Sequence, residues 1–190
     1  VVEQEVDFEI EMIIGEDCST DNTKKIVEKY EKLYPEIVKP IYNEENFGKK
    51  YGSGGGRDNF LNVLKHCTGR YIAVLDGDDY FLPGKLQKQI NFMQENLNLA
   101  MSFHNVREIN ENEKYIRNIN SNETAKFTDV NYLIENGTFF ANTSVMYKRE
   151  FLDIDLLDKL HPYTHGDWLL HIIVARNGQI GYIDEVLAVY

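Results

Sequence analysis

Three carboxylates lie within four residues, at Asp76, Asp78 and Asp79. They follow the apolar run of residues 71–75, which is typical of a buried strand. Carboxylates this close repel one another unless water or a cation neutralises them. Mg²⁺ or Mn²⁺ would do so, because such ions take one or two carboxylates together with water and phosphate oxygens. A ligand-free acidic turn is the alternative; the position after a buried strand favours a metal site.

A second pair of acids, Glu16 and Asp17, ends another strand pattern over residues 8–14. The polar residues 19–23 that follow would cap a helix whatever the protein does. That capping does not explain two acids at a strand end. A carboxylate there could accept a hydrogen bond from a nucleotide base or from a ribose hydroxyl.

A glycine-rich loop at residues 48–56 leads to Arg57. The loop lacks the phosphate-cradling GxxxxGK[S/T] pattern, and a flexible linker is the simpler explanation. A guanidinium at the start of a helix is nevertheless suited to a phosphate or a base carbonyl.

Asp167 stands at the start of the helical pattern of residues 167–177. It could cap that helix, or it could act as a general base toward a hydroxyl group. The neighbouring His165 is interpreted as a surface or hydrogen-bonding residue, and the histidines show no metal-ligand spacing. Patterns of serine, zinc and dinucleotide enzymes such as GxSxG, HExxH and GxGxxG are absent from the sequence.

The elements that must position these residues alternate along the chain. Strands are predicted at 8–14, 38–42, 71–75, 99–106, 143–148, 179–183 and 186–190, with helices between them that include 127–136 and 151–160. Such alternation predicts an α/β fold with a mostly parallel sheet flanked by helices. Ligands bind beyond the carboxyl ends of such strands, where both acidic clusters stand. The polar residues 108–126 are interpreted as a solvated excursion.

Composition limits the alternatives. A chain of 190 residues that is 43% hydrophobic suits one folded domain. A net charge of −11 argues against nucleic acid or anionic membrane as a partner bound through bulk charge. Two cysteines without paired spacing, and no apolar stretch near the ~20 residues that span a bilayer, favour a cytoplasmic protein.

In order along the chain, five segments resemble family 2 glycosyltransferases, the inverting enzymes of the GT-A (nucleotide-diphospho-sugar transferase, Rossmann-like) fold. Residues 13–23 resemble the family's strand followed by "DDGSTDNT", and residues 46–48 with 57–59 resemble "N-x-G…ARN". Residues 67–79 are similar to "ATGEYIAFLDSDD", 82–86 to "L-P-x-K-L", and 166–168 to the late "E/G-D" motif.

The resemblance implies a role for each candidate. Asp17 with Glu16 would contact the nucleotide base, and Arg57 would lie by the base or the diphosphate. Asp76 would lie near the ribose and the metal, and Asp78 would be the principal ligand of a divalent cation, Mg²⁺ or Mn²⁺. Asp167 would deprotonate the acceptor hydroxyl, and the cation would neutralise the departing nucleoside diphosphate.

The sequence also departs from the family pattern. The first strand and the "P-x-Y-N" nucleotide loop are missing, the loop at 48–56 is long, and Tyr190 ends the chain where relatives continue. We therefore expect residues 1–190 to be a single GT-A domain truncated at both ends.

The expected function is transfer of a sugar from a nucleotide-diphosphate donor, by resemblance a UDP-sugar, to a hydroxyl of a saccharide or lipid-linked acceptor in polysaccharide or glycolipid synthesis. Peripheral membrane association through the missing segments stays open. A non-catalytic GT-A-like module that binds a sugar nucleotide is the main alternative. A nucleotidyltransferase would carry an early basic glycine loop, and the sequence shows none.

Overall fold

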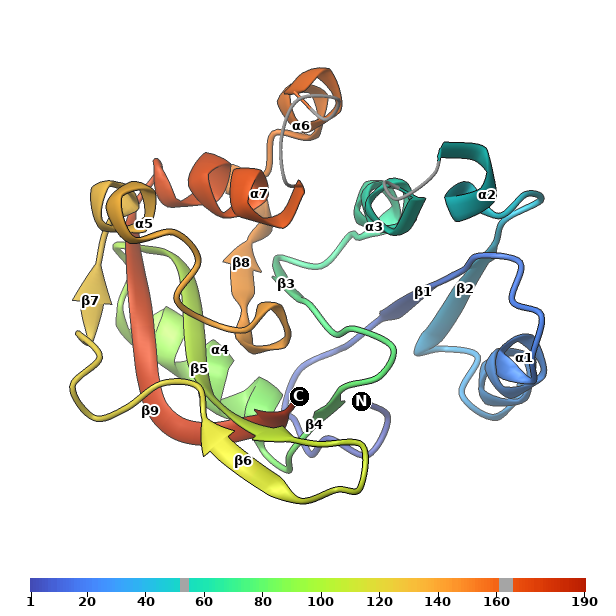
Figure 1. Ribbon diagram of the computed structural model, residues 1–190, viewed down its shortest axis with the longest axis horizontal. Coiled ribbons are helices and arrows are strands. Elements are labelled where there is room, and N and C mark those ends of the chain that lie inside the picture. The colour runs from blue at the N-terminus through green and yellow to red at the C-terminus, as the bar shows by residue number, and fades with distance from the viewer. Residues whose placement is uncertain (52–54, 161–165) are drawn as a thin grey trace. The chain divides into compact units, whose positions relative to one another are not determined.

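The computed structural model describes residues 1–51, 55–160 and 166–190, which form two compact units. The first unit consists mainly of residues 8–69 with helix α6 (Ile154–Leu160). The second consists mainly of Arg70–Asp153 and the chain from helix α7 (Gly166–Ala175) to Tyr190. Figure 1 shows the elements of both units.

The first unit is built on two parallel strands, β1 (Met12–Glu16) and β2 (Val38–Tyr42). Helix α1 (Thr23–Leu33) connects them, and α2 (Phe47–Tyr51) and α3 (Gly55–His66) follow. Gly15 allows α3 to pack directly against β1, because a Cβ there would lie 2.7 Å from Val63 Cγ2. The end of β1 is thereby held against the helix that carries Arg57.

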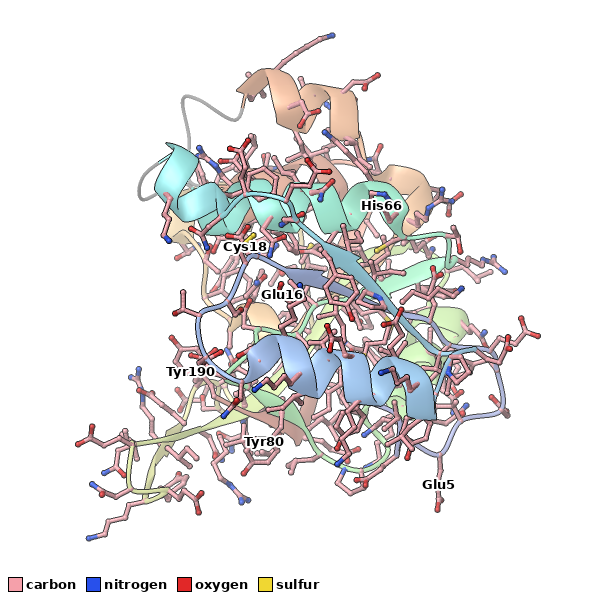
Figure 2. The ribbon with its side chains drawn as sticks, turned by 90° about the vertical axis from the view of Figure 1, so that its right-hand side faces the viewer. Glu5, Glu16, Cys18, His66, Tyr80 and Tyr190 are labelled. Carbon is pink, nitrogen blue, oxygen red and sulfur yellow. The ribbon has the colours of Figure 1, made fainter. Side chains whose placement is uncertain are left out.

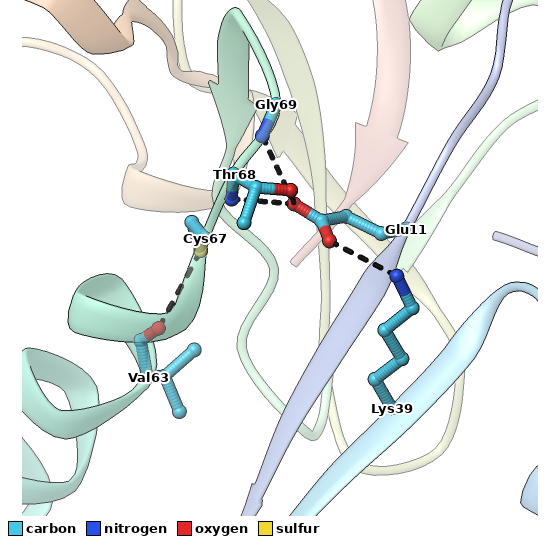
Figure 3. Close-up of polar contacts among 6 residues, drawn as sticks. All are labelled: Glu11, Lys39, Val63, Cys67, Thr68 and Gly69. Carbon is cyan, nitrogen blue, oxygen red and sulfur yellow. Dashed lines mark hydrogen bonds and ion pairs between the residues drawn. The ribbon is translucent and has the colours of Figure 1, made fainter.

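In the same unit, the carboxylate of Glu11 joins the chain just before β1 to the turn after α3 (Figure 3). Its Oε1 accepts hydrogen bonds from Thr68 N at 2.6 Å, Thr68 Oγ1 at 2.9 Å and Gly69 N at 2.9 Å. Lys39 Nζ lies 3.4 Å from Oε2. Partial burial works against ionisation, but these hydrogen bonds lower the pKa of Glu11 below its usual value.

The second unit contains a seven-stranded sheet in which five strands follow the order β3-β8-β5-β9-β4. These strands are β3 (Tyr71–Ala73), β8 (Met146–Lys148), β5 (Leu99–Ile109), β9 (Gln179–Val189) and β4 (Tyr80–Phe81). Strand β6 (Tyr115–Asn118) pairs with β5, and β7 (Phe127–Thr128) pairs with β9.

Strand direction sets where the acidic residues lie. β3 and β5 each pair antiparallel with β8, and β5 pairs parallel with β9. The strands β3, β5 and β9 therefore run the same way, and their carboxyl ends lie at one edge. The α/β class is as predicted, but the pairing is mixed rather than mostly parallel. The antiparallel pairs are β3 with β8, β8 with β5, β6 with β5, β7 with β9, and β4 with β9.

Helices cover both faces of this sheet. Gln89 of α4 (Lys85–Glu95) donates a hydrogen bond from Nε2 to Ser102 Oγ of β5 at 3.1 Å. The next residue, Phe103, stacks on Phe140 at 4.8 Å, and Phe140 contacts His171 of α7 at 4.9 Å, both between ring centroids. Because neighbouring strand residues face opposite ways, α4 and α7 lie on opposite faces.

Three predictions for the second unit need correction. The two predicted strands at 179–183 and 186–190 are one strand, β9, in which Asp184 and Glu185 form an exposed irregularity. The predicted helix at 127–136 begins as strand β7 and continues as α5 (Val130–Asn136). The segment 108–126, interpreted as a solvated excursion, includes β6. All four residues of β6 are exposed, so no apolar alternation signals the strand.

Within the described part of the chain, every helix is too short or too polar to cross a bilayer.

Candidate functional site

The acid at the end of β1 is turned inward. Glu16 is only 3% exposed, and its Oε1 accepts a hydrogen bond from Ser19 N at 2.7 Å. Figure 2 labels Glu16 at the end of this strand, with Cys18 in the turn beyond it. The carboxylate of Glu16 therefore shapes the turn that leads to α1.

Asp17 holds a second segment in place. Its Oδ1 and Oδ2 lie 3.0 and 3.1 Å from Phe47 N, and its Oδ1 also accepts from Asn43 Nδ2 at 3.1 Å. The side chain of Asn46 donates to the backbone carbonyl of Asp17. Asp17 thus fixes the chain between β2 and α2, close to the carboxyl ends of β1 and β2.

Asparagine side chains extend this network into α3. Asn43 Nδ2 donates to Asn59 Oδ1 at 2.9 Å, and Asn62 Nδ2 donates to Asn43 Oδ1 at 3.2 Å. Asn59 Nδ2 in turn donates to Gly15 O at 2.9 Å. Arg57 is half-buried in the first turn of α3, two residues before Asn59. The network therefore ties the helix of Arg57 to the strand that ends in Glu16 and Asp17.

The roles of Asn43 and Asn62 are absent from the sequence interpretation, because isolated asparagines in a polar region carry no pattern. Residues 52–54 of the glycine loop and the residue His165 lie outside the described residues.

The second unit holds the three-carboxylate turn. Asp79 N donates to Asp76 O at 3.2 Å, which closes the turn after β3. Partial burial raises the pKa of Asp76, and the negative charges of Asp78 and Asp167 raise it further, against a hydrogen bond from Asn142 at 3.5 Å. Burial followed by the charges of Asp76 and Asp78 raises the pKa of Asp79 to about 6. The turn therefore carries more negative charge than its surroundings compensate.

Asp167 belongs to the same neighbourhood. It is the second residue of α7 and is exposed, and its Oδ1 accepts from Trp168 N at 2.8 Å. Its charge contributes to the raised pKa of Asp76. The structure thus brings together the predicted metal ligands, Asp76 and Asp78, and the predicted base.

A buried polar pair lies beneath these acids. The hydroxyl of Tyr147 and Nδ1 of His171 form a hydrogen bond of 2.7 Å, and both side chains are fully buried. Burial raises the pKa of Tyr147, and the charges of Asp167 and Asp76 raise it further. Burial lowers the pKa of His171 to about 4. His171 stands one helical turn after Asp167, within the helical pattern predicted over residues 167–177.

The residues fit a divalent cation of the Mg²⁺ type. Across residues 1–51, 55–160 and 166–190, no group of three or more His, Cys, Asp and Glu side chains is arranged to hold a metal ion. Mg²⁺ needs only one or two carboxylates beside water and phosphate oxygens. Asp79 Oδ2 is buried without a hydrogen-bond partner, and the repulsion within the turn favours a positive ion nearby.

Glu16, Asp17 and Arg57 belong to the first unit, and Asp76, Asp78 and Asp167 belong to the second. The structure groups the candidates into these two sets, each within its own unit.

Comparison with known proteins gives a consistent result. The model of the family Glycosyl transferase family 2 matches residues 1–154. An uncharacterized protein of Mycobacterium tuberculosis is 32% identical over 188 residues, which are 98% of this chain and 51% of that protein. The chain thus spans about half the length of that relative.

Solved structures of S. aureus TarS have the same fold. TarS 1–349 in complex with UDP matches with a TM-score of 0.71 and 22% identity, over 97% of this chain and 52% of TarS 1–349. The complex with UDP-GlcNAc matches with a TM-score of 0.66 and 22% identity, over 95% of this chain and 49% of that chain. The predicted GT-A fold is therefore confirmed.

Proposed function

Because the chain belongs to glycosyl transferase family 2, we propose that it transfers a sugar from a nucleoside-diphosphate donor to a hydroxyl group of a saccharide or lipid-linked acceptor. The observation that carries this proposal is the shared neighbourhood of Asp76, Asp78 and Asp167. The carboxylates of Asp76 and Asp78 suit a cation that binds the diphosphate. The carboxylate of Asp167 suits a hydroxyl group. The proposal includes a cytoplasmic setting and a role in polysaccharide or glycolipid synthesis.

A UDP-sugar is the donor we favour. TarS, which shares the fold, has been crystallised with UDP and with UDP-GlcNAc. In the first unit, the buried Glu16 and the network around Asp17 set the shape of the turn after β1. We assign Glu16 and Asp17 to recognition of the uracil base, and Arg57 to the base or the diphosphate. An ionised carboxylate has about four acceptor positions, so Asp17 retains capacity for a ligand beside its bonds within the chain.

Asp78 and Asp76 are the residues that would hold Mg²⁺ or Mn²⁺. When bound, such a cation supplies positive charge that neutralises the diphosphate leaving group. The charge of Asp78 raises the pKa of Asp76, and the charges of both aspartates raise the pKa of Asp79. A positive ion would relieve this repulsion.

Asp167 is the residue we assign to proton transfer. Its carboxylate is exposed at the start of α7 and can therefore reach an acceptor hydroxyl. It takes the proton while the hydroxyl oxygen attacks the anomeric carbon, and the bond to the UDP oxygen breaks with its electrons on UDP. A single direct displacement inverts the configuration at that carbon.

The test is release of UDP from UDP-GlcNAc, UDP-glucose and UDP-galactose in the presence of Mn²⁺. Loss of a general base typically costs 10²- to 10⁴-fold, so Asp167→Asn is expected to reduce release at least ~100-fold while UDP affinity changes little. Asp155→Asn is the matched control, because Asp155 is likewise exposed and the second residue of a helix, α6.

Binding of UDP without release from any of the three donors would instead support the non-catalytic module.

A further inference from the structure

A groove lies in the second unit and plays no part in the roles assigned above. It has a volume of about 500 Å³, within the range of small-molecule sites. The polar and aromatic residues that line it are Tyr80, Arg107, Glu113, Tyr115 and Asn118, and Ile109 and Val186 supply apolar surface. None of these residues was a candidate in the sequence analysis.

The sheet aligns three of the lining residues. Tyr80 of β4 pairs with Val189 of β9, Val189 pairs with Arg107 of β5, and Arg107 pairs with Asn118 of β6. Side chains of paired residues share a face of a sheet, and adjacent strands lie about 4.8 Å apart. The groove therefore runs across the ends of four strands. Figure 1 shows β6 reaching out at this end of the sheet, and Figure 2 labels Tyr80 and Tyr190 there.

The opposite face of the same hairpin carries an ion pair. Glu108 and Arg117 form an ion pair of 2.6 Å, and these residues alternate with the lining residues along β5 and β6. Arg107 differs from Arg117 in this respect. It is exposed, and it makes no ion pair with any carboxylate of the described residues that the structure records.

The hairpin turn fixes the rim of the groove. Asn110 Oδ1 accepts hydrogen bonds from Asn112 N at 2.9 Å and Lys114 N at 3.1 Å, and Glu113 N donates to Asn110 O at 2.8 Å. Glu113 adopts a left-handed φ of 57° in this turn. Its carboxylate, which lines the groove, can accept hydrogen bonds from hydroxyl groups.

The groove lies next to the proposed reaction centre in the fold. Tyr80 follows Asp79 directly in the sequence. Ala73 at the end of β3 pairs with Met146 of β8, which pairs with Ser102 of β5, and the acidic turn leads from β3 to Tyr80 of β4. The acidic turn therefore ends at the lining of the groove, with Asp79 next to Tyr80 in the chain.

The side chains that line the groove suit a sugar that carries a negatively charged group. Tyr80 and Tyr115 are 52% and 62% exposed, so their rings offer flat apolar surface with a polar edge. A guanidinium binds a carboxylate or a phosphate through two parallel hydrogen bonds. Asn118 and Glu113 supply donors and acceptors for hydroxyl groups.

We propose that this groove is a subsite for the acceptor, and that it selects a saccharide carrying a carboxylate or phosphate group, which Arg107 binds. The inference rests on the proposed function, since it names the substrate class for the hydroxyl that Asp167 would deprotonate.

The test uses three probes that differ only at C6 of glucose, namely methyl β-D-glucuronide, methyl β-D-glucoside 6-phosphate and methyl β-D-glucoside. Their affinities are measured by NMR titration of the whole chain. The expected result is that at least one charged probe binds about 10-fold or more tightly than the glucoside. The stronger of the two charged probes identifies carboxylate or phosphate as the group.

Variants locate the site. Arg107→Gln is expected to remove the preference for the charged probe, and Tyr115→Ala is expected to weaken all three probes. Arg117→Gln is the matched control on the other face of the hairpin and is expected to change none of them. Equal affinity for charged and neutral probes, or equal loss in Arg107→Gln and Arg117→Gln, would overturn the proposal.

The same variants separate this inference from the proposed function. UDP binding in Mn²⁺ should be unchanged in Arg107→Gln, because that residue is not assigned to the donor. If the charged probe binds through Arg107 but no UDP-sugar releases UDP, the groove stands as a saccharide site and the transferase assignment fails.

Discussion

The carboxylate of Asp17 accepts the backbone N–H of Phe47, which lies 3.0 Å from Oδ1 and 3.1 Å from Oδ2. This bond joins the turn after β1 to the start of α2. A residue that the resemblance assigns to the nucleotide base thus also organises the surrounding chain, and the two roles call for separate measurements.

Replacement of Asp17 should affect stability in a graded way. Asp17→Ala removes both acceptors of Phe47 N and one of the two acceptors of Asn43 Nδ2. We expect the free energy of unfolding to fall by about 1 kcal/mol. Asp17→Asn keeps one oxygen acceptor and should cost less. Urea unfolding measures both, with Glu44→Ala, an exposed acid of the same segment, as control. If Asp17→Asn is as stable as the parent chain yet binds UDP at least ~10-fold more weakly, direct contact with the nucleotide is supported.

Glu11 should make stability depend on acid. Its pKa is lowered in the folded chain, so its stabilisation is present above the unfolded value of 4.5 and disappears as the pH falls through the lower folded value. We expect Glu11→Gln to cost about 1 kcal/mol at pH 7 and less at pH 3. Thermal unfolding at both pH values checks this, and Glu9→Gln, an exposed neighbour, should be neutral throughout. A cost for Glu11→Gln that is equal at both pH values would show that charge is not involved.

His171 should also make stability fall in acid. The cause at Glu11 is an acid that stays ionised, whereas the cause at His171 is a buried base that stays neutral. Burial lowers its pKa from 6.5 to about 4, so the folded chain binds fewer protons than the unfolded chain between these values. Stability therefore falls as the pH drops from 6.5 to about 4. We expect His171→Gln to have a lower free energy of unfolding overall. Its stability should also fall less steeply over this pH range, by up to ~1.4 kcal/mol per pH unit. His66→Gln, which alters an exposed histidine, should keep the parent slope.

Gly178 should tolerate no side chain. A Cβ at this position would lie 2.5 Å from Asn98 O and 3.0 Å from Ala100 N, both backbone atoms. We expect Gly178→Ala to lower the free energy of unfolding by about 1–3 kcal/mol. Gly56→Ala is the contrasting variant, because a Cβ there meets nothing within 4 Å and lies within a helix. Alanine at Gly56 should therefore stabilise by up to ~1 kcal/mol. A neutral Gly178→Ala would show that β9 shifts freely.

The elements that carry the acids follow from local pattern. The apolar run before Asp76 and the helical period after Asp167 each predict an element and its boundary, because burial of one face dictates the sequence. The same logic fails for β6, whose four residues are all exposed. Its pairing with β5 depends on backbone hydrogen bonds, which leave no trace in side-chain types, and the groove beside it was missed for that reason.

Antiparallel β8 and the pair of Tyr147 and His171 were missed for a different reason. Both depend on which segments meet in three dimensions. An apolar run is compatible with either strand direction, and a histidine within an apolar helix face reads as core until its partner is known.

The most direct test of the central claim is titration of UDP into the chain by calorimetry, once with Mn²⁺ and once with EDTA. Asp78→Asn is measured beside Glu111→Gln, an exposed acid of the same unit. If the acidic turn holds a cation that receives the diphosphate, EDTA and Asp78→Asn should each weaken UDP binding at least ~10-fold, while Glu111→Gln has no effect. Equal affinity in Mn²⁺ and EDTA, or undiminished binding by Asp78→Asn, would contradict the account.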